Sequence, residues 1–99
     1  MAIVEVSIVP IGTHSTGVSE YVRAALEVIR QSGLKHELNP MGTCIEGDLE
    51  SVFAVIRRMH EALAGMGCAR LVTTIKIDDR RDRPGDMQGK VQRVLNPPR

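Results

Sequence analysis

Residues 39–48 read NPMGTCIEGD, and this stretch decides how the rest of the chain is arranged. Pro40 has a fixed φ that suits the second position of a type I turn, and Gly42 takes the last position, where glycine is favoured. Strand residues lie on both sides of the turn, at 35–39 and 43–46, and Asp48 then stands as a candidate helix N-cap. The stretch therefore predicts a β-hairpin that leads directly into a helix.

The chain before the hairpin predicts one strand and one helix. Residues 2–9 alternate and are rich in β-branched side chains, which is typical of a strand, and Pro10 ends it. A helix follows, with Ser19 as the expected N-cap and Gly33 as the stop. Its apolar face repeats at helical spacing through Val22, Ala25, Leu26 and Ile29.

The chain after the hairpin repeats this pattern. The second helix runs from Asp48 to the glycines at 65 and 67, and residues 71–78 form the longest expected strand. The expected apolar stripe of that helix is Val52, Phe53, Ile56, Met59, Leu63 and Met66. Residues 90–95 form a short extra C-terminal segment, either helix or strand.

The order β-α-β-β-α-β over one domain, residues 1–99, predicts an α+β, ferredoxin-like sandwich. In this arrangement a four-stranded antiparallel sheet carries both helices on one face. The other face stays uncovered, and its expected mixture of apolar and hydroxyl-bearing side chains suits an oligomer interface, a ligand floor, or both.

Composition argues against several functional classes. The formal net charge of +1 offers no general attraction to nucleic acid or to an anionic membrane. Both aromatic residues, Tyr21 and Phe53, fall in expected helices, whereas RNA binding by this fold uses aromatics on the strands. No apolar run is long enough to span a bilayer, and the N-terminus lacks the pattern of a signal peptide. We therefore expect a cytoplasmic protein.

The sequence contains no clear set of residues for metal binding or for nucleophilic catalysis. The three histidines fall in a loop, a strand and a helix without metal-ligand spacing, so we expect no metal and no cofactor. Cys44 and Cys68 are interpreted as buried free thiols, with Cys44 facing the core. The arginines of residues 80–83 alternate with aspartates, which predicts a solvated and partly self-paired loop. No catalytic residue is assigned.

Residues 12–17 form a hydroxyl-rich loop before the first helix, and this position suits an anion. Thr13, Thr16 and Ser19, together with Ser15, could supply hydroxyl donors there. The loop has no arginine, and its hydroxyls also fit turn and cap roles. An enzyme that binds an anion at this loop therefore remains an alternative.

A small-molecule site has more support, because polar groups lie among apolar ones on the strands and hairpin. The candidate ligand-binding residues are Thr43, Glu46, Asn39, Met41, Thr74 and Ser7. Glu46 could instead be an exposed strand-end carboxylate, or the salt-bridge partner of Lys76. In a regular strand Thr43 and Glu46 lie on opposite faces, so both can line one pocket only with a bulge or a second subunit.

At these residues the chain resembles the small thiamine-binding-protein family. The resemblance covers nearly the whole chain and rests on Pro10-Ile11-Gly12, Pro40-Met41-Gly42-Thr43, Ile45-Glu46-Gly47, Thr74-Ile75-Lys76-Ile77-Asp78-Asp79-Arg80 and Lys90-Val91. It implies a ferredoxin-like fold, dimers that pair through their sheets, often tetramers, and no established enzyme activity. Some relatives bind thiamine or its hydroxymethylpyrimidine part.

The expected function is therefore non-catalytic binding of thiamine or a related pyrimidine, at or near a subunit interface. Thr43, Asn39 and Thr74 would orient an aminopyrimidine, and Glu46 would meet the thiazolium cation or the amino group. A regulatory or structural homo-oligomer without such a ligand is the second alternative.

Overall fold

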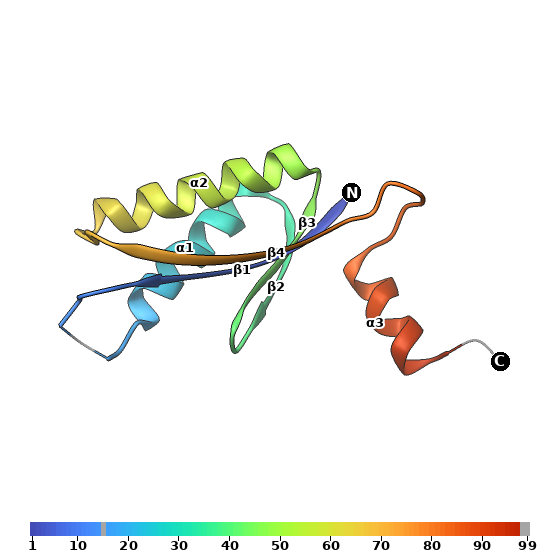
Figure 1. Cartoon of the computed structure of the whole chain (residues 1–99), viewed down its shortest axis with the longest axis horizontal. Helices are drawn as coiled ribbons and strands as arrows, with labels where there is room; N and C mark the ends of the chain where they lie inside the picture. The colour runs from blue at the N-terminus through green and yellow to red at the C-terminus, as the bar shows by residue number, and fades with distance from the viewer. Residues whose placement is uncertain (15, 98–99) are drawn as a thin grey trace.

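The computed structural model describes residues 1–14 and 16–97, and it has the predicted order of elements with one more helix (Figure 1). The elements are β1 (Ala2–Pro10), α1 (Ser19–Ser32), β2 (Lys35–Asn39), β3 (Gly42–Gly47), α2 (Leu49–Gly65), β4 (Leu71–Asp79) and α3 (Met87–Leu95). The first six elements confirm the ferredoxin-like prediction.

The four strands form one sheet in the order β2-β3-β1-β4, and every neighbouring pair is antiparallel. Val6 at the centre of β1 pairs with Thr43 on one side and with Ile75 on the other. The even-numbered residues of β1 are buried beneath α1 and α2, which both pack on this helix-covered face (Figure 1). The odd-numbered residues of β1 point to the opposite face, called the open face below.

The hairpin between β2 and β3 closes through Pro40 and Met41 alone, because Asn39 pairs with Gly42. Neither turn residue has a positive φ, which excludes a type I′ turn and fits the predicted type I turn. Gly42 is required for a second reason, since a Cβ there would lie 3.0 Å from the carbonyl oxygen of Val6. The hairpin therefore lies close against β1.

The core is aliphatic, and it joins the inner sheet face to the two helices. Ile45 of β3 and Leu63 of α2 are completely buried, and Ile29 of α1 is 1% exposed. The predicted stripe of α2 is wrong at Phe53 and Met66, which are exposed. Val55 is buried instead, because the true stripe follows residues 52, 55, 56, 59 and 63 at helical spacing.

The two long helices begin differently. Asp48 caps α2 as predicted, because its carboxylate accepts a hydrogen bond of 3.1 Å from the main-chain N–H of Ser51. The prediction that Ser19 caps α1 is wrong. Val18 is the N-cap, with no capping side-chain hydrogen bond, and Ser19 is already the first helical residue.

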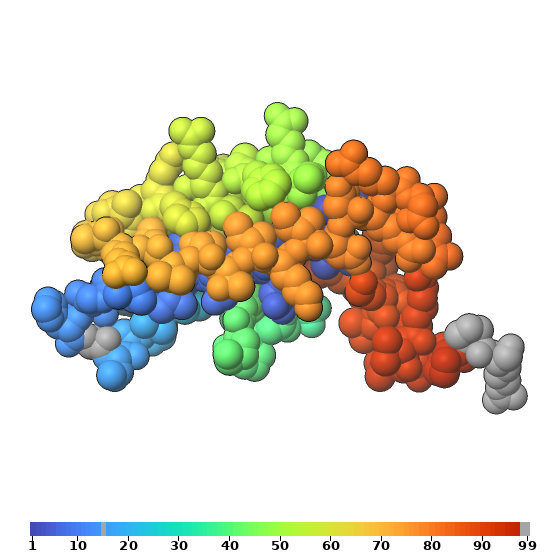
Figure 2. All heavy atoms as spheres, viewed as in Figure 1, coloured from blue at the N-terminus to red at the C-terminus, as the bar shows by residue number. Residues whose placement is uncertain are grey.

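The C-terminal segment is a helix, α3, which begins three residues earlier than the predicted segment. Asp86 is its N-cap and accepts a hydrogen bond of 2.6 Å from the N–H of Gly89. Figures 1 and 2 show α3, in red, in a lobe at one end of the molecule, away from α1 and α2. Only Met87 of this helix is buried.

Cys44 does not face the core, contrary to the prediction. It pairs with Glu5 and Glu37 across the sheet and therefore lies on the open face, where it is half-buried. Alternation along β3 explains this, because completely buried Ile45 must point the other way from both of its neighbours. Cys68 is also only half-buried.

The charged loop after β4 is partly self-paired, as predicted. Arg80 donates two hydrogen bonds to the carboxylate of Asp82, and Arg81 donates one to Asp79. The Arg80 hydrogen bonds lower the pKa of Asp82 to about 2. Among the described helices, none combines the length and apolar character that crossing a membrane requires.

Candidate functional site

A cavity of about 230 Å³ lies on the helix-covered side of the sheet, between α1 and the β2–β3 hairpin. Its walls are mainly aliphatic and include Val6 and Ile8 of β1, Val22, Ala25, Leu26 and Ile29 of α1, Met59 of α2 and Leu38 of β2. No charged or aromatic residue occurs among the described residues that line it. The cavity therefore suits an uncharged and largely apolar group.

The small side chain of Ala25 in α1 leaves room for the cavity between the larger side chains of that helix. Ala25 is buried and faces the sheet with only a methyl group, so the space beside it is left unfilled. Val22 and Leu38 on the two sides of the opening stay 39% and 53% exposed, although both are apolar. An apolar surface left accessible in this way is typical of a ligand pocket.

Thr43 is the most buried polar residue in the lining of this cavity. It is 7% exposed and points toward the helices from β3, opposite Val6. Among the described residues, no hydrogen bond includes the Thr43 hydroxyl. Every fully buried side-chain N or O atom in that part of the chain has a hydrogen-bond partner, so this hydroxyl is not fully buried. The hydroxyl is therefore open to the cavity, where it can donate one hydrogen bond and accept others.

Three more candidate residues border the same cavity. Met41 is 86% exposed at the hairpin tip, beside the opening. Asn39 and Ser7 belong to the open face by register, so they border the cavity mainly through the main chain. The Asn39 side-chain amide instead donates to the Cys44 sulfur over 3.4 Å.

Glu46 lies on the open face, away from the cavity. Its Oε1 accepts a hydrogen bond of 2.8 Å from the N–H of Met87, and its Oε2 lies 3.9 Å from Lys35 Nζ. The side chain is 5% exposed. The interpretations of Glu46 as an exposed carboxylate or a partner of Lys76 are therefore wrong, because this carboxylate holds the start of α3.

Thr74 also lies apart from the cavity. It is exposed on the open face of β4, where it pairs with Ser7. The structure thus brings the side chains of Thr43 and Met41 to the cavity, with Asn39 and Ser7 bordering it mainly through the main chain, and leaves Thr74 and Glu46 away from it on the open face. The sequence did not indicate that residues of α1 line a cavity, because a residue that lines a cavity and one that fills a core have the same apolar pattern.

The loop before α1 forms only a shallow hollow, bordered by Pro10, Ile11, Gly12, Thr13, His14 and Thr16. Ser19 lies beyond it, in the first turn of α1, and Ser15 falls outside the described residues. His14 has a φ of 62°, which is uncommon for a residue with a side chain. The residues of this hollow carry no arginine or lysine that would attract an anion.

Cys44 is poorly suited to nucleophilic chemistry. Burial raises the pKa of its thiol, and the nearby Glu5 carboxylate raises it further. The thiolate, which is the reactive form, is thereby disfavoured.

Comparison with known proteins places the chain in a family. The sequence model described as "Thiamine-binding protein" matches residues 4–95. The UPF0045 protein YqgV of Bacillus subtilis is 42% identical over 98 residues, covering 95% of this chain and 94% of the relative. A UPF0045 protein of Methanothermobacter thermautotrophicus is 39% identical, with 95% and 96% covered.

Solved structures agree with this assignment. The hypothetical protein MJ1052 of Methanocaldococcus jannaschii superposes with a TM-score of 0.87 at 35% identity, covering 95% of each chain. A domain of unknown function, DUF77, from Bacillus cereus superposes with a TM-score of 0.85 at 29% identity, with 96% and 90% covered. The chain therefore belongs to the thiamine-binding protein family.

Proposed function

We propose that the cavity between α1 and the hairpin binds thiamine through its hydroxymethylpyrimidine part, and that the protein carries out no chemistry on it. The observation that carries the proposal is the hydroxyl of Thr43, a nearly buried side chain, in the lining of a mainly aliphatic cavity. Small-molecule sites combine apolar walls with a few placed polar groups. The family match supports a thiamine-related ligand.

The size of the cavity favours one ring over two. A volume of about 230 Å³ lies just below the ~300–1,000 Å³ of drug-sized sites, so a substituted pyrimidine fits better than both rings of thiamine. The thiazolium ring would lie outside, near Met41. Because no described residue of the lining is charged, the cation gains no carboxylate partner there. Free hydroxymethylpyrimidine should therefore bind about as tightly as thiamine.

Replacing Thr43 with valine tests the role of the hydroxyl. The change keeps the shape of the side chain but leaves a polar ligand atom without its partner, which costs about 1–3 kcal/mol. We expect the dissociation constant for hydroxymethylpyrimidine to rise roughly 5- to 150-fold in calorimetric titration.

Thr74→Val is the matched control, because it makes the same chemical change on the open face. It should leave the affinity unchanged. Equal affinities for wild type and Thr43→Val would refute the role of Thr43. The absence of binding heat and of any thermal shift at millimolar ligand would refute the proposed function as a whole.

A second proposal is that two copies pair through their open faces. Val9 and Val72 are 40% and 47% exposed there, although they belong to the sheet. Val91 and Val94 of α3 are also exposed. Paired copies would cover Val9 and Val72, and the mass in solution, measured by light scattering, should then be at least twice the 10.9 kDa of one chain.

A further inference from the structure

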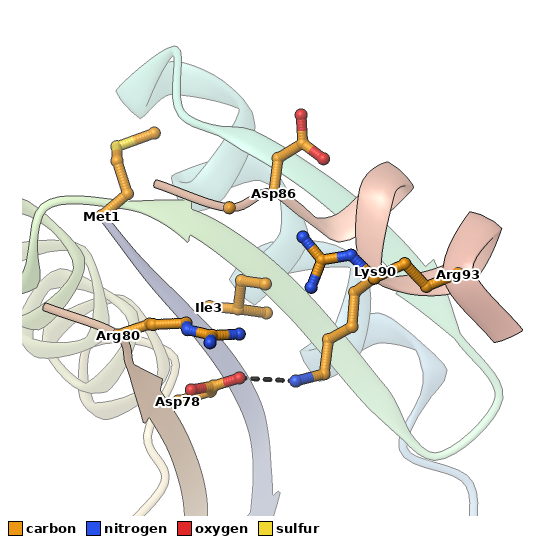
Figure 3. Close-up of a pocket in the computed structure, with 8 residues that line it drawn as sticks. Met1, Ile3, Asp78, Arg80, Asp86, Lys90 and Arg93 are labelled. Atoms are coloured by element: carbon orange, nitrogen blue, oxygen red, sulfur yellow. Dashed lines mark hydrogen bonds and ion pairs between the residues drawn. The ribbon is translucent and has the colours of Figure 1, made fainter. Parts of the chain in front are cut away.

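Three basic side chains gather away from the ligand cavity, between α3 and the end of β4 (Figure 3). A small cleft of about 40 Å³ opens there on the open face, beside Ile3. Its basic residues come from two separate parts of the chain, with Arg80 after β4 and Lys90 and Arg93 on α3. None of them takes part in the proposed pyrimidine site.

Two of the three cations already have a carboxylate partner. Lys90 Nζ lies 2.5 Å from an oxygen of Asp78, which lowers the pKa of that carboxyl group. Arg80 donates two hydrogen bonds to Asp82, at 2.8 and 3.1 Å. Asp86, also at the cleft, caps the N–H of Gly89, and Figure 3 shows its carboxylate pointing away from Arg80 and Lys90.

Arg93 is different, because no ion pair of the described residues includes it. Its side chain nevertheless turns back from α3, and in the view of Figure 3 its guanidinium lies over the cleft, between Asp86 and Arg80. Like charges repel each other, so an anion placed between Arg93 and Arg80 would stabilise this arrangement. Among the described residues, Arg93 is the one basic group of the cleft that has no ion-pair partner.

We propose that this cleft binds a phosphate group, held mainly by Arg93 with Lys90 and Arg80 beside it. Guanidinium groups bind tetrahedral oxyanions through paired N–H donors, and an ammonium adds a point charge. A single water needs about 10–15 Å³ of such space, so 40 Å³ holds one small polyatomic anion. The organic part of a phosphate monoester would have to lie outside.

Phosphate in this position would join α3 to the body of the protein. Arg80 follows the sheet, whereas Arg93 lies in the last turn of α3, so one anion would bridge the two. In the described residues, α3 is otherwise held by the Met87–Glu46 hydrogen bond, the Lys90–Asp78 pair and the burial of Met87. Phosphate should therefore slow hydrogen exchange of the α3 amides.

Titration with sodium phosphate, against sodium chloride at equal ionic strength, tests the proposal on the intact chain. We expect saturable binding, with protection of residues 87–95 in hydrogen exchange. Arg93→Gln should weaken phosphate binding by about tenfold or more, which corresponds to one charged hydrogen-bonding group. Arg93→Lys keeps the positive charge but loses the paired N–H donors of the guanidinium. Its affinity for phosphate should lie between those of the wild type and Arg93→Gln.

Arg83→Gln is the matched control, because Arg83 lies in the same charged loop as Arg80 but does not line the cleft. It should bind phosphate like the wild type. Equal weakening by Arg83→Gln and Arg93→Gln, or phosphate effects no larger than those of chloride, would overturn the proposal.

A parallel titration with glycerol phosphate identifies the source of the group. If glycerol phosphate and inorganic phosphate bind with equal affinity, the site is assigned to inorganic phosphate. If glycerol phosphate binds more tightly, the site is assigned to a phosphate monoester. Arg93→Gln should leave hydroxymethylpyrimidine binding unchanged, and Thr43→Val should leave phosphate binding unchanged, so the two proposals fail independently.

Discussion

Replacing Leu63 with alanine is expected to lower the free energy of unfolding by about 2–5 kcal/mol. Leu63 is completely buried in the second half of α2, within the cluster that joins both helices to the inner face of the sheet. The change removes buried apolar surface and leaves a cavity that the surrounding side chains refill only in part. For a small domain this is a large share of the total stability.

Urea denaturation at a fixed protein concentration measures the effect, because any self-association makes stability depend on concentration. Leu95→Ala is the control, since Leu95 is 66% exposed on α3. It should change the free energy of unfolding by less than about 0.5 kcal/mol. Similar losses for the two variants would show that Leu63 is not at the centre of the core.

Replacing Glu46 with alanine is expected to release α3 and to cost about 1–3 kcal/mol of stability. The change removes the acceptor of the Met87 N–H at a buried position, and it also leaves Lys35 without its carboxylate. We expect the amides of residues 87–95 to lose protection in hydrogen exchange, while those of β1 and β3 keep theirs.

Two further variants define the reason for this loss. Glu46→Gln keeps an oxygen that can accept from Met87, so it should retain more of the α3 protection than the alanine variant. Glu37→Ala removes a carboxylate from an exposed position of neighbouring β2 and should have little effect. Unchanged protection of α3 in Glu46→Ala would show that this carboxylate does not hold the helix.

Much of the fold could be predicted from sequence because its signals are local. Alternation in β1, the turn at Pro40 and Gly42, and the cap at Asp48 each depend on neighbours within a few residues. The predictions were wrong where tertiary contacts, and not sequence neighbours, determine the position of a residue. Phe53 is apolar and therefore belongs to the predicted stripe of α2, but it lies one residue away from the row that is buried.

The site was harder to predict for the same reason. Strand alternation correctly separates Thr43 from Glu46, yet nothing local indicates which of them meets a cavity. The hydrogen-bond partner of Glu46 is Met87, 41 residues further along the chain. Met87 begins α3, whose residues 90–95 the sequence predicts only as either helix or strand. The cavity itself depends on the small size of Ala25 opposite the hairpin, and an alanine on a helix face gives no such signal.

Chemical-shift mapping of the isotopically labelled protein with hydroxymethylpyrimidine tests the central claim most directly, because it locates the ligand without assuming a binding residue. We predict saturable shifts for the methyl groups of Val22, Leu26, Leu38 and Thr43, and unchanged signals from Val72 and Thr74 on the open face. Shifts confined to the open face and α3, with the cavity methyl groups unperturbed, would contradict the account.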